Sequence, residues 1–125
     1  HEHDRASLLV GSDLSGADDT IADILIDIAS KETMPRSDAL AAVMVEELFY
    51  QLGAVNAEPL RKAGFTVLKS PDIPSILIEA GFLSTQSDLD NLIDPLWRKK
   101  FVTGVQKAIQ NWVSSDTAAS IRRRQ

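Results

Sequence analysis

The first periodic pattern lies early in the chain, where large apolar residues recur at the spacing of one helix face. They fall at positions i, i+3, i+4 and i+7 of a single run: Ile21, Ile24, Leu25 and Ile28. Asp18 or Asp19 stands just before this run and is a suitable N-cap. The pattern predicts a helix that buries the stripe against a core. Another helix is expected over residues 1–10, ending near Gly11 and continuing one that begins upstream.

A second pattern at the same spacing predicts a helix that begins at Pro35, where the missing N–H costs nothing, and ends before Gly53. Four residues line its core face: Leu40, Met44, Leu48 and Leu52. Pro95 is expected to open a third long helix. Its apolar face carries five residues: Trp97, Phe101, Val105, Ala108 and Trp112. These side chains are typical of core packing and do not suggest a ligand site.

The stretch between these helices predicts extended structure. Residues 65–69 alternate in the strand manner and are rich in β-branched and aromatic side chains. Residues 75–79 are apolar on both faces, which is typical of a strand covered on both sides of a sheet. Prolines between the two runs exclude one continuous helix. A short helix over residues 88–93, capped by Ser84 or Ser87, is expected before the last long helix.

Two strands do not form a stable sheet alone, so their partners are expected upstream. The predicted fold class is therefore α/β, a mixed sheet flanked by helices, with this chain as the second half of the domain. The domain is assigned to residues 1–113, and residues 114–125 are expected to form a flexible polar and basic tail. The sequence lacks an initiator Met and begins within an expected helix, so we expect it to be a piece of a longer protein, and the absence of a signal peptide then says nothing about the location of that protein.

Composition and charge narrow the classes of function. The 125 residues are 44% hydrophobic and 25% charged, as expected for one globular domain. The net charge of −5 argues against a nucleic-acid groove, which needs clustered basic residues. The one basic cluster, Arg122 to Arg124, is expected to be a solvated tail, with polyanion binding as the alternative. No run approaches the ~20 apolar residues of a membrane span, and the absence of cysteine excludes thiolate metal ligands.

A single carboxylate stands at the exit of the most apolar run. Glu79 ends residues 75–79 and precedes a turn at Gly81. In α/β sheets ligands gather outside the carboxyl ends of strands, and a poorly solvated carboxylate there is suited to act as a general base. The alternative is a glutamate that merely marks the end of a strand and points to water. Spacing alone leaves both interpretations open.

The residue string around Glu79 is more specific than its spacing. Residues 63–85, AGFTVLKSPDIPSILIEAGFLST, closely resemble the signature of the zinc-dependent N-acetylmuramoyl-L-alanine amidases, the cell-wall amidases of the bacterial division type. The upstream stretch DDTIADILIDIASKET resembles the family as well, and the resemblance extends over residues 1–112. Thr85 departs from the family's usual Asn. The matching residues are Gly64, Phe65, Val67, Leu68, Lys69, Pro71, Asp72, Ile73, Pro74, Ser75, Leu77, Glu79, Phe82 and Ser84.

This resemblance implies a zinc amidase and exopeptidase-like fold and a hydrolase that cuts the amide between N-acetylmuramic acid and the L-alanine of the stem peptide. It implies one zinc ion, held by a His, a Glu and a second His in the first half of the domain, with a water in the fourth position. The family's catalytic acid/base corresponds to Glu79, which would take the proton of that water and hand it to the leaving amine. Peptidoglycan as partner, daughter-cell separation as the process and a periplasmic location follow from the same resemblance.

Two other functions remain open. One is a non-catalytic peptidoglycan- or partner-binding module of the same fold, and the other is a zinc carboxypeptidase that acts on stem peptides. No His–Glu–His set is present, because His1 and His3 are the only histidines and are expected at the surface of a helix. The other zinc ligands are therefore expected upstream of this chain.

The same resemblance suggests Glu2 as an inhibitory zinc ligand. The division-type amidases resemble one another in a helix that covers the zinc until an activator protein moves it, and a Glu from that region can occupy the open position. The stretch HEHDRASLLVG resembles the end of that region, although an ungapped count back from Gly11 puts the family's Glu nearer His3. The alternative is an ordinary solvent-facing glutamate.

Other members of the signature are expected to have structural roles. Lys69 is expected to position a loop or cap a helix end, and Asp72 to organise the turn between the two neighbouring prolines. Ser75 and Ser84 lack a His partner, so the sequence argues against serine-nucleophile catalysis.

Overall fold

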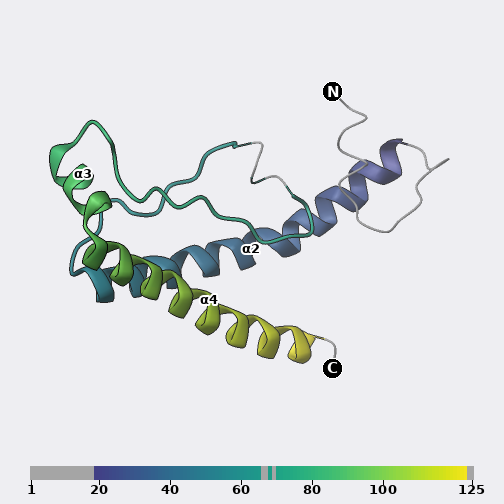
Figure 1. Cartoon of the computed structure of the whole chain (residues 1–125). Coiled ribbons are helices and arrows are strands. Elements are labelled where there is room, and N and C mark those ends of the chain that lie inside the picture. Colours follow the sequence, from purple (N-terminus) through teal and green to yellow (C-terminus); the bar gives the residue numbers. More distant parts are fainter. Residues whose placement is uncertain (1–18, 66–67, 69, 124–125) are drawn as a thin grey trace. The chain divides into compact units, whose positions relative to one another are not determined.

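The computed structural model describes residues 19–65, 68 and 70–123 (Figure 1). Within these residues the elements are α2 (Asp19–Leu52), α3 (Gln86–Ile93) and α4 (Pro95–Arg123), with no strand. Internal contacts divide the chain into two compact units, which are described separately. The first comprises His1–Asp38 and Ala63–Ser75, and the second comprises Ala39–Lys62 and Ile76–Gln125.

α2 begins at Asp19, as the sequence predicts, but it is one continuous helix across Pro35. The prediction of a separate helix beginning at Pro35 is wrong. A proline removes one N–H donor and crowds the carbonyl four residues earlier, so its cost is confined to one turn. Leu40 and Met44, which follow the proline on the same helix, are buried in the core of the second unit.

The core of the second unit is built where the sequence predicts it. Leu40, Met44 and Leu48 of α2 are buried together with Ala108 of α4. This arrangement confirms both predicted apolar faces, because each presents residues three or four positions apart to the other helix. Eight partly buried residues pack around the cluster: Val43, Leu52, Val55, Ile76, Ile78, Phe101, Val105 and Trp112.

Gly53 ends α2 as predicted. Its φ of +78° lies in the left-handed region, and its N–H donates to the Phe49 carbonyl oxygen at 2.8 Å. This is the geometry of a glycine after a helix C-terminus, where it satisfies a carbonyl that the helix leaves without a partner.

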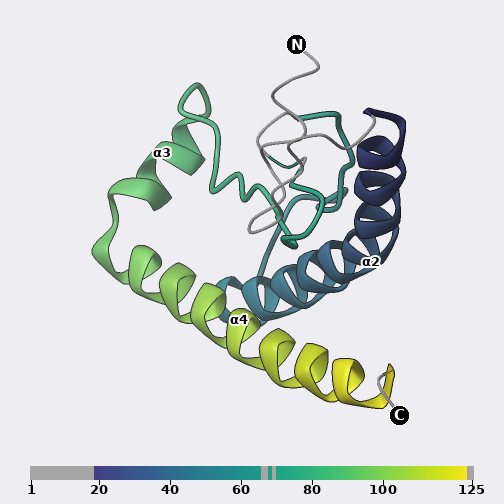
Figure 2. The ribbon, with the colours of Figure 1, turned by 90° about the vertical axis from the view of Figure 1, so that its right-hand side faces the viewer.

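A short turn at Asp94 joins α3 to α4, as Figure 2 shows. The N-cap of α3 is Thr85, without a side-chain hydrogen bond, so the prediction of Ser84 or Ser87 as cap is wrong. The C-terminal end of α3 is satisfied by Arg98, whose guanidinium donates to the carbonyl oxygens of Leu92 at 3.0 Å and Ile93 at 2.9 Å. α4 begins at Pro95, as predicted.

The face of α4 carries the predicted aromatic residues and continues past the expected domain end. Trp97 and Phe101 stack with their ring centroids 5.2 Å apart. Residues 114–123, which the sequence assigned to a tail, belong to this helix. The boundary between a domain over 1–113 and a separate tail remains a prediction.

The stripe at the start of α2 does not form a core, contrary to the prediction. Its four residues have exposed fractions between 44% and 59%: Ile21, Ile24, Leu25 and Ile28. Periodicity shows which residues share a helix face, but it does not show whether a partner surface for that face is present. The part of the chain that the structure describes leaves this face uncovered.

The two predicted strands are also absent from the described residues. Residues 75–79 have no regular secondary structure, and in the other run Phe65 is irregular and Leu68 lies in a 3₁₀ turn, while 66, 67 and 69 lie outside the described residues. A strand needs a neighbouring strand to bond its backbone, and two short runs do not supply one. The α/β sheet therefore remains a prediction. The helix expected over 1–10 also lies outside the described residues.

Candidate functional site

Glu79 lies on the exposed side of residues 75–79, whose opposite side packs against the core of the second unit. Ile76 and Ile78 pack against the core of the second unit, whereas Leu77 and Glu79 are exposed. Burial thus alternates from residue 76 to residue 79, with the two isoleucines on the packed side and Leu77 and Glu79 on the exposed side. The expectation that both faces of 75–79 are covered is wrong, and Glu79 is open to solvent rather than poorly solvated.

The turn after Glu79 is fixed by α3. The Phe82 N–H donates to Asp88 Oδ2 at 3.0 Å, and the Thr85 N–H donates to the Phe82 carbonyl oxygen at 3.0 Å. A Cβ placed on Gly81 would lie 3.1 Å from Asp88 Cβ. The backbone at Gly81 therefore lies close to Asp88 in the first turn of α3, and the lack of a side chain at Gly81 permits this approach.

The turn that precedes the segment is also hydrogen-bonded. The Ser70 hydroxyl donates to Asp72 Oδ1 at 3.0 Å, and Pro71 is fully buried. This bond joins Asp72 to the residue before Pro71, and the expected role of Asp72 in organising the turn between the two prolines remains a prediction. The Ser75 hydroxyl donates to the Ile73 carbonyl oxygen at 3.0 Å, so it has a structural partner.

Ser37 of α2 ties this turn to the helix within the first unit. The Ser75 backbone N–H donates to Ser37 Oγ at 3.0 Å, and the Ser37 hydroxyl donates to the Thr33 carbonyl oxygen at 3.3 Å. Thr33 is buried, with 6% of its surface exposed. One hydroxyl thus serves as acceptor and donor at the point where residues 75–79 begin.

The described residues do not fit a zinc ion by themselves. They contain no group of three or more His, Asp or Glu side chains that could hold a metal ion. His1, His3, the tentative ligand Glu2 and Lys69 lie outside the described residues. The catalytic candidate Glu79 is therefore found without the metal ligands that the amidase resemblance implies.

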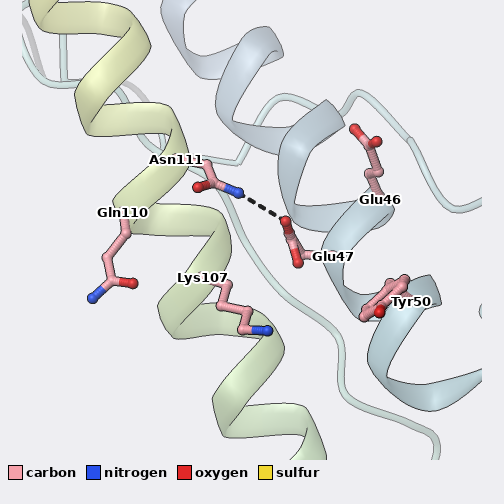
Figure 3. Close-up of a pocket in the computed structure, with 6 residues that line it drawn as sticks. All are labelled: Glu46, Glu47, Tyr50, Lys107, Gln110 and Asn111. Carbon is pink, nitrogen blue, oxygen red and sulfur yellow. Dashed lines mark hydrogen bonds between the residues drawn. The ribbon is translucent and has the colours of Figure 1, made fainter.

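A polar groove lies between α2 and α4 in the second unit (Figure 3). Its volume is about 550 Å³, and Asn111 Nδ2 donates to Glu47 Oε1 across it at 2.8 Å. Its lining residues are exposed apart from the half-buried Glu47, and Glu79 is not among them. The lining combines acidic, basic and neutral polar side chains that are mostly exposed, so it does not favour one class of ligand. The lining consists of Glu46, Glu47, Tyr50, Lys107, Gln110 and Asn111.

Sequence reasoning missed Asp88 as part of the site. It lies three residues after the N-cap Thr85, at the position where an acidic residue commonly bonds the N-cap backbone. That spacing could have drawn attention to it, but its actual partner, Phe82, depends on how the loop returns to α3.

Comparison with known proteins gives one consistent result. The family model of N-acetylmuramoyl-L-alanine amidases matches residues 11–111. The amidase AmiA of Escherichia coli K12 is 26% identical over 124 residues, which cover 95% of this chain and 42% of that protein. The amidase AmiC of Neisseria meningitidis is 29% identical over 91 residues, covering 73% of this chain and 22% of that protein.

The chain spans less than half the length of these curated relatives. No solved structure gives a significant match to it. Among the described residues, no helix combines the length and apolar character needed to cross a membrane.

Proposed function

The chain belongs to the N-acetylmuramoyl-L-alanine amidase family, and from this membership we propose that the protein hydrolyses the amide between N-acetylmuramic acid and L-alanine in peptidoglycan. The observation that carries the proposal is the match over residues 11–111, which includes Glu79 and both turns that flank it. Trimming of the cell wall during daughter-cell separation is the process that fits this reaction.

Glu79 is the proposed general acid/base. Its carboxylate accepts a proton from the attacking water while the water oxygen forms a bond to the amide carbon. The same carboxyl group then gives that proton to the alanine nitrogen as the carbon–nitrogen bond breaks. The products are a free muramic carboxylate and a stem peptide with a free L-alanine amine. Glu79 is exposed, so an incoming substrate and water can reach it, and its proposed role rests on the family match rather than on desolvation of the carboxylate.

Zinc is the proposed cofactor, with its main ligands outside this chain, since the described residues contain no set that fits it. We propose Glu2 as an inhibitory ligand that an activator protein displaces, and a periplasmic location for the enzyme. If Glu2 has this role, Glu2→Ala raises hydrolysis in the absence of an activator. Equal rates for Glu2→Ala and the wild type would contradict it.

The decisive test compares the zinc-loaded native protein that carries this chain with its Glu79→Gln variant on purified peptidoglycan. The wild type is expected to release intact stem peptides that begin with L-alanine, and the variant to lose about 10²-fold or more in rate. Glu58→Gln is the matched control, because Glu58 is exposed and lies outside the segment that carries Glu79. It is expected to act like the wild type.

Other products would contradict the amidase proposal. Shortened stem peptides would indicate a carboxypeptidase. The zinc-loaded Glu2→Ala variant could also bind insoluble peptidoglycan without releasing any peptide. That result would indicate a non-catalytic binding module. Equal activity of Glu79→Gln and the wild type would show that Glu79 is not the acid/base.

A further inference from the structure

We propose that Asp88 is a positioning residue for Glu79, acting through the backbone of the turn that separates them. This inference rests on the proposed role of Glu79 as acid/base. The Asp88 carboxylate accepts the Phe82 N–H at 3.0 Å, and Phe82 follows Glu79 by three residues. A hydrogen bond to an ionised carboxylate is stronger than one between neutral groups, so it is well suited to hold a solvent-exposed loop.

The backbone that carries Glu79 is held from both sides. On the upstream side, Ile78 packs against the core of the second unit. On the downstream side, the Phe82 N–H is bound by Asp88, which leaves only Ala80 and Gly81 between Glu79 and the second anchor. An acid/base must be placed accurately relative to its substrate, because a displacement of about 1 Å can cost about 10²-fold in rate.

Gly81 contributes the close approach that this contact requires. A Cβ at this position would lie 3.1 Å from Asp88 Cβ and 3.4 Å from Asp88 Cγ. Such distances are shorter than ordinary carbon–carbon contacts of about 3.5–4.0 Å. A methyl group at Gly81 therefore requires the Asp88 side chain to shift by a few tenths of an ångström, which disturbs its contact with the Phe82 N–H.

The alternative is that Asp88 only stabilises the start of α3. An acidic residue in the first turn of a helix interacts favourably with the helix dipole, and one three residues after the N-cap can bond the N-cap N–H. Here the Thr85 N–H donates instead to the Phe82 carbonyl oxygen at 3.0 Å. The Asp88 carboxylate is directed to the loop that follows Glu79, and this favours the positioning role.

The test uses three variants of the native protein in the peptidoglycan assay. Asp88→Ala removes the acceptor, and it is expected to lower kcat about tenfold or more with KM changed less than about twofold. Asp88→Asn keeps an oxygen that can accept the Phe82 N–H, and it is expected to restore kcat to within about threefold of the wild type. Asp90→Ala is the control, because Asp90 lies on the same helix and its carboxylate accepts a hydrogen bond from Gln86 Nε2 at 2.8 Å.

A second readout does not depend on activity. Hydrogen exchange of the Phe82 amide, followed by NMR in the metal-free protein, is expected to become about fivefold faster or more in Asp88→Ala. It is expected to stay near the wild-type rate in Asp88→Asn and Asp90→Ala. Gly81→Ala should accelerate the same amide, whereas Gly64→Ala should not, since a methyl at Gly64 meets nothing within 4 Å.

The outcomes separate the two proposals. The positioning role is overturned if Asp88→Ala leaves kcat unchanged, or if Asp88→Ala and Asp88→Asn lower kcat equally. The acid/base role of Glu79 is tested separately by Glu79→Gln. An unchanged Phe82 exchange rate in Asp88→Ala would overturn the contact itself. If Glu79→Gln retains full activity, the acid/base assignment fails, and the positioning role that rests on it fails too, even where the Phe82 amide responds as expected.

Discussion

Gly104 of α4 and Leu48 of α2 lie so close that a methyl group on Gly104 would come within 2.9 Å of Leu48 Cδ2. The same methyl would lie 3.4 Å from the Glu47 carbonyl oxygen, which belongs to the backbone of α2 and cannot rotate away. Both Gly104 and Leu48 are buried. The missing side chain at Gly104 therefore permits the two helices to approach at this point.

The first prediction follows from this contact. Gly104→Val should lower the free energy of unfolding by about 2 kcal/mol, because a bulky side chain in a packed interface forces the neighbouring atoms to move. Urea denaturation followed by circular dichroism measures the change. Gln106→Val is the control, since Gln106 is exposed on the same helix and gains the same β-branched side chain. Because valine has a higher helix propensity than glycine and a lower one than glutamine, a loss in Gly104→Val no larger than that in Gln106→Val would contradict the effect of the contact with Leu48.

Helical spacing predicted the core of the second unit but could not show which apolar stripe would be covered. Leu40, Met44 and Leu48 repeat every four residues and are buried against Ala108. Ile24 and Ile28 have the same kind of spacing on the same helix and are exposed. The difference depends on whether another surface lies opposite the stripe, and a single stripe carries no information about its partner.

The second prediction compares these two parts of α2. Met44→Ala should cost about 2–5 kcal/mol of stability, because it removes a large buried side chain and leaves a cavity. Ile24→Ala should cost less than about 0.5 kcal/mol, since Ile24 is already 54% exposed. Thermal and urea unfolding of both variants measure the difference. A cost for Ile24→Ala close to that of Met44→Ala would mean that another part of the protein covers the stripe.

The third prediction concerns the end of α2. Gly53 has a φ of +78°, a conformation that costs a residue with a Cβ about 1 kcal/mol. Gly53→Ala should therefore lower the free energy of unfolding by about 1 kcal/mol, although a methyl group there meets no atom within 4 Å. Gly64→Ala adds a methyl to equally open space without the positive φ. A loss in both variants would assign the effect to something other than backbone conformation.

The candidate site shows a different limit of sequence reasoning. The residue string identified Glu79, because a long match to a family signature does not depend on local periodicity. The environment of Glu79 does not follow from the sequence in the same way: apolar residues on both faces of 75–79 predict cover on both faces, and only one face is packed. Asp88 could not be assigned from sequence, because its contact with Phe82 joins residues that only the loop geometry brings together.

The last prediction concerns Ser37, whose hydroxyl accepts the Ser75 backbone N–H at 3.0 Å in a partly buried position. Ser37→Ala removes this acceptor and leaves the Ser75 N–H without its protein partner, so stability should fall by about 1–2 kcal/mol. Ser37→Thr keeps the hydroxyl, and with it both the Ser75 contact and the bond to the Thr33 carbonyl oxygen. It should therefore be close to the wild type in urea unfolding.

Hydrogen exchange of the Ser75 amide distinguishes this contact from a general loss of stability. The amide should exchange about fivefold faster or more in Ser37→Ala under conditions where the rest of α2 remains protected. In Ser37→Thr its rate should stay near that of the wild type. If Ser37→Ala leaves both the unfolding curve and the Ser75 amide unchanged, water replaces the hydroxyl without cost, and the turn before Glu79 does not depend on α2 for its position.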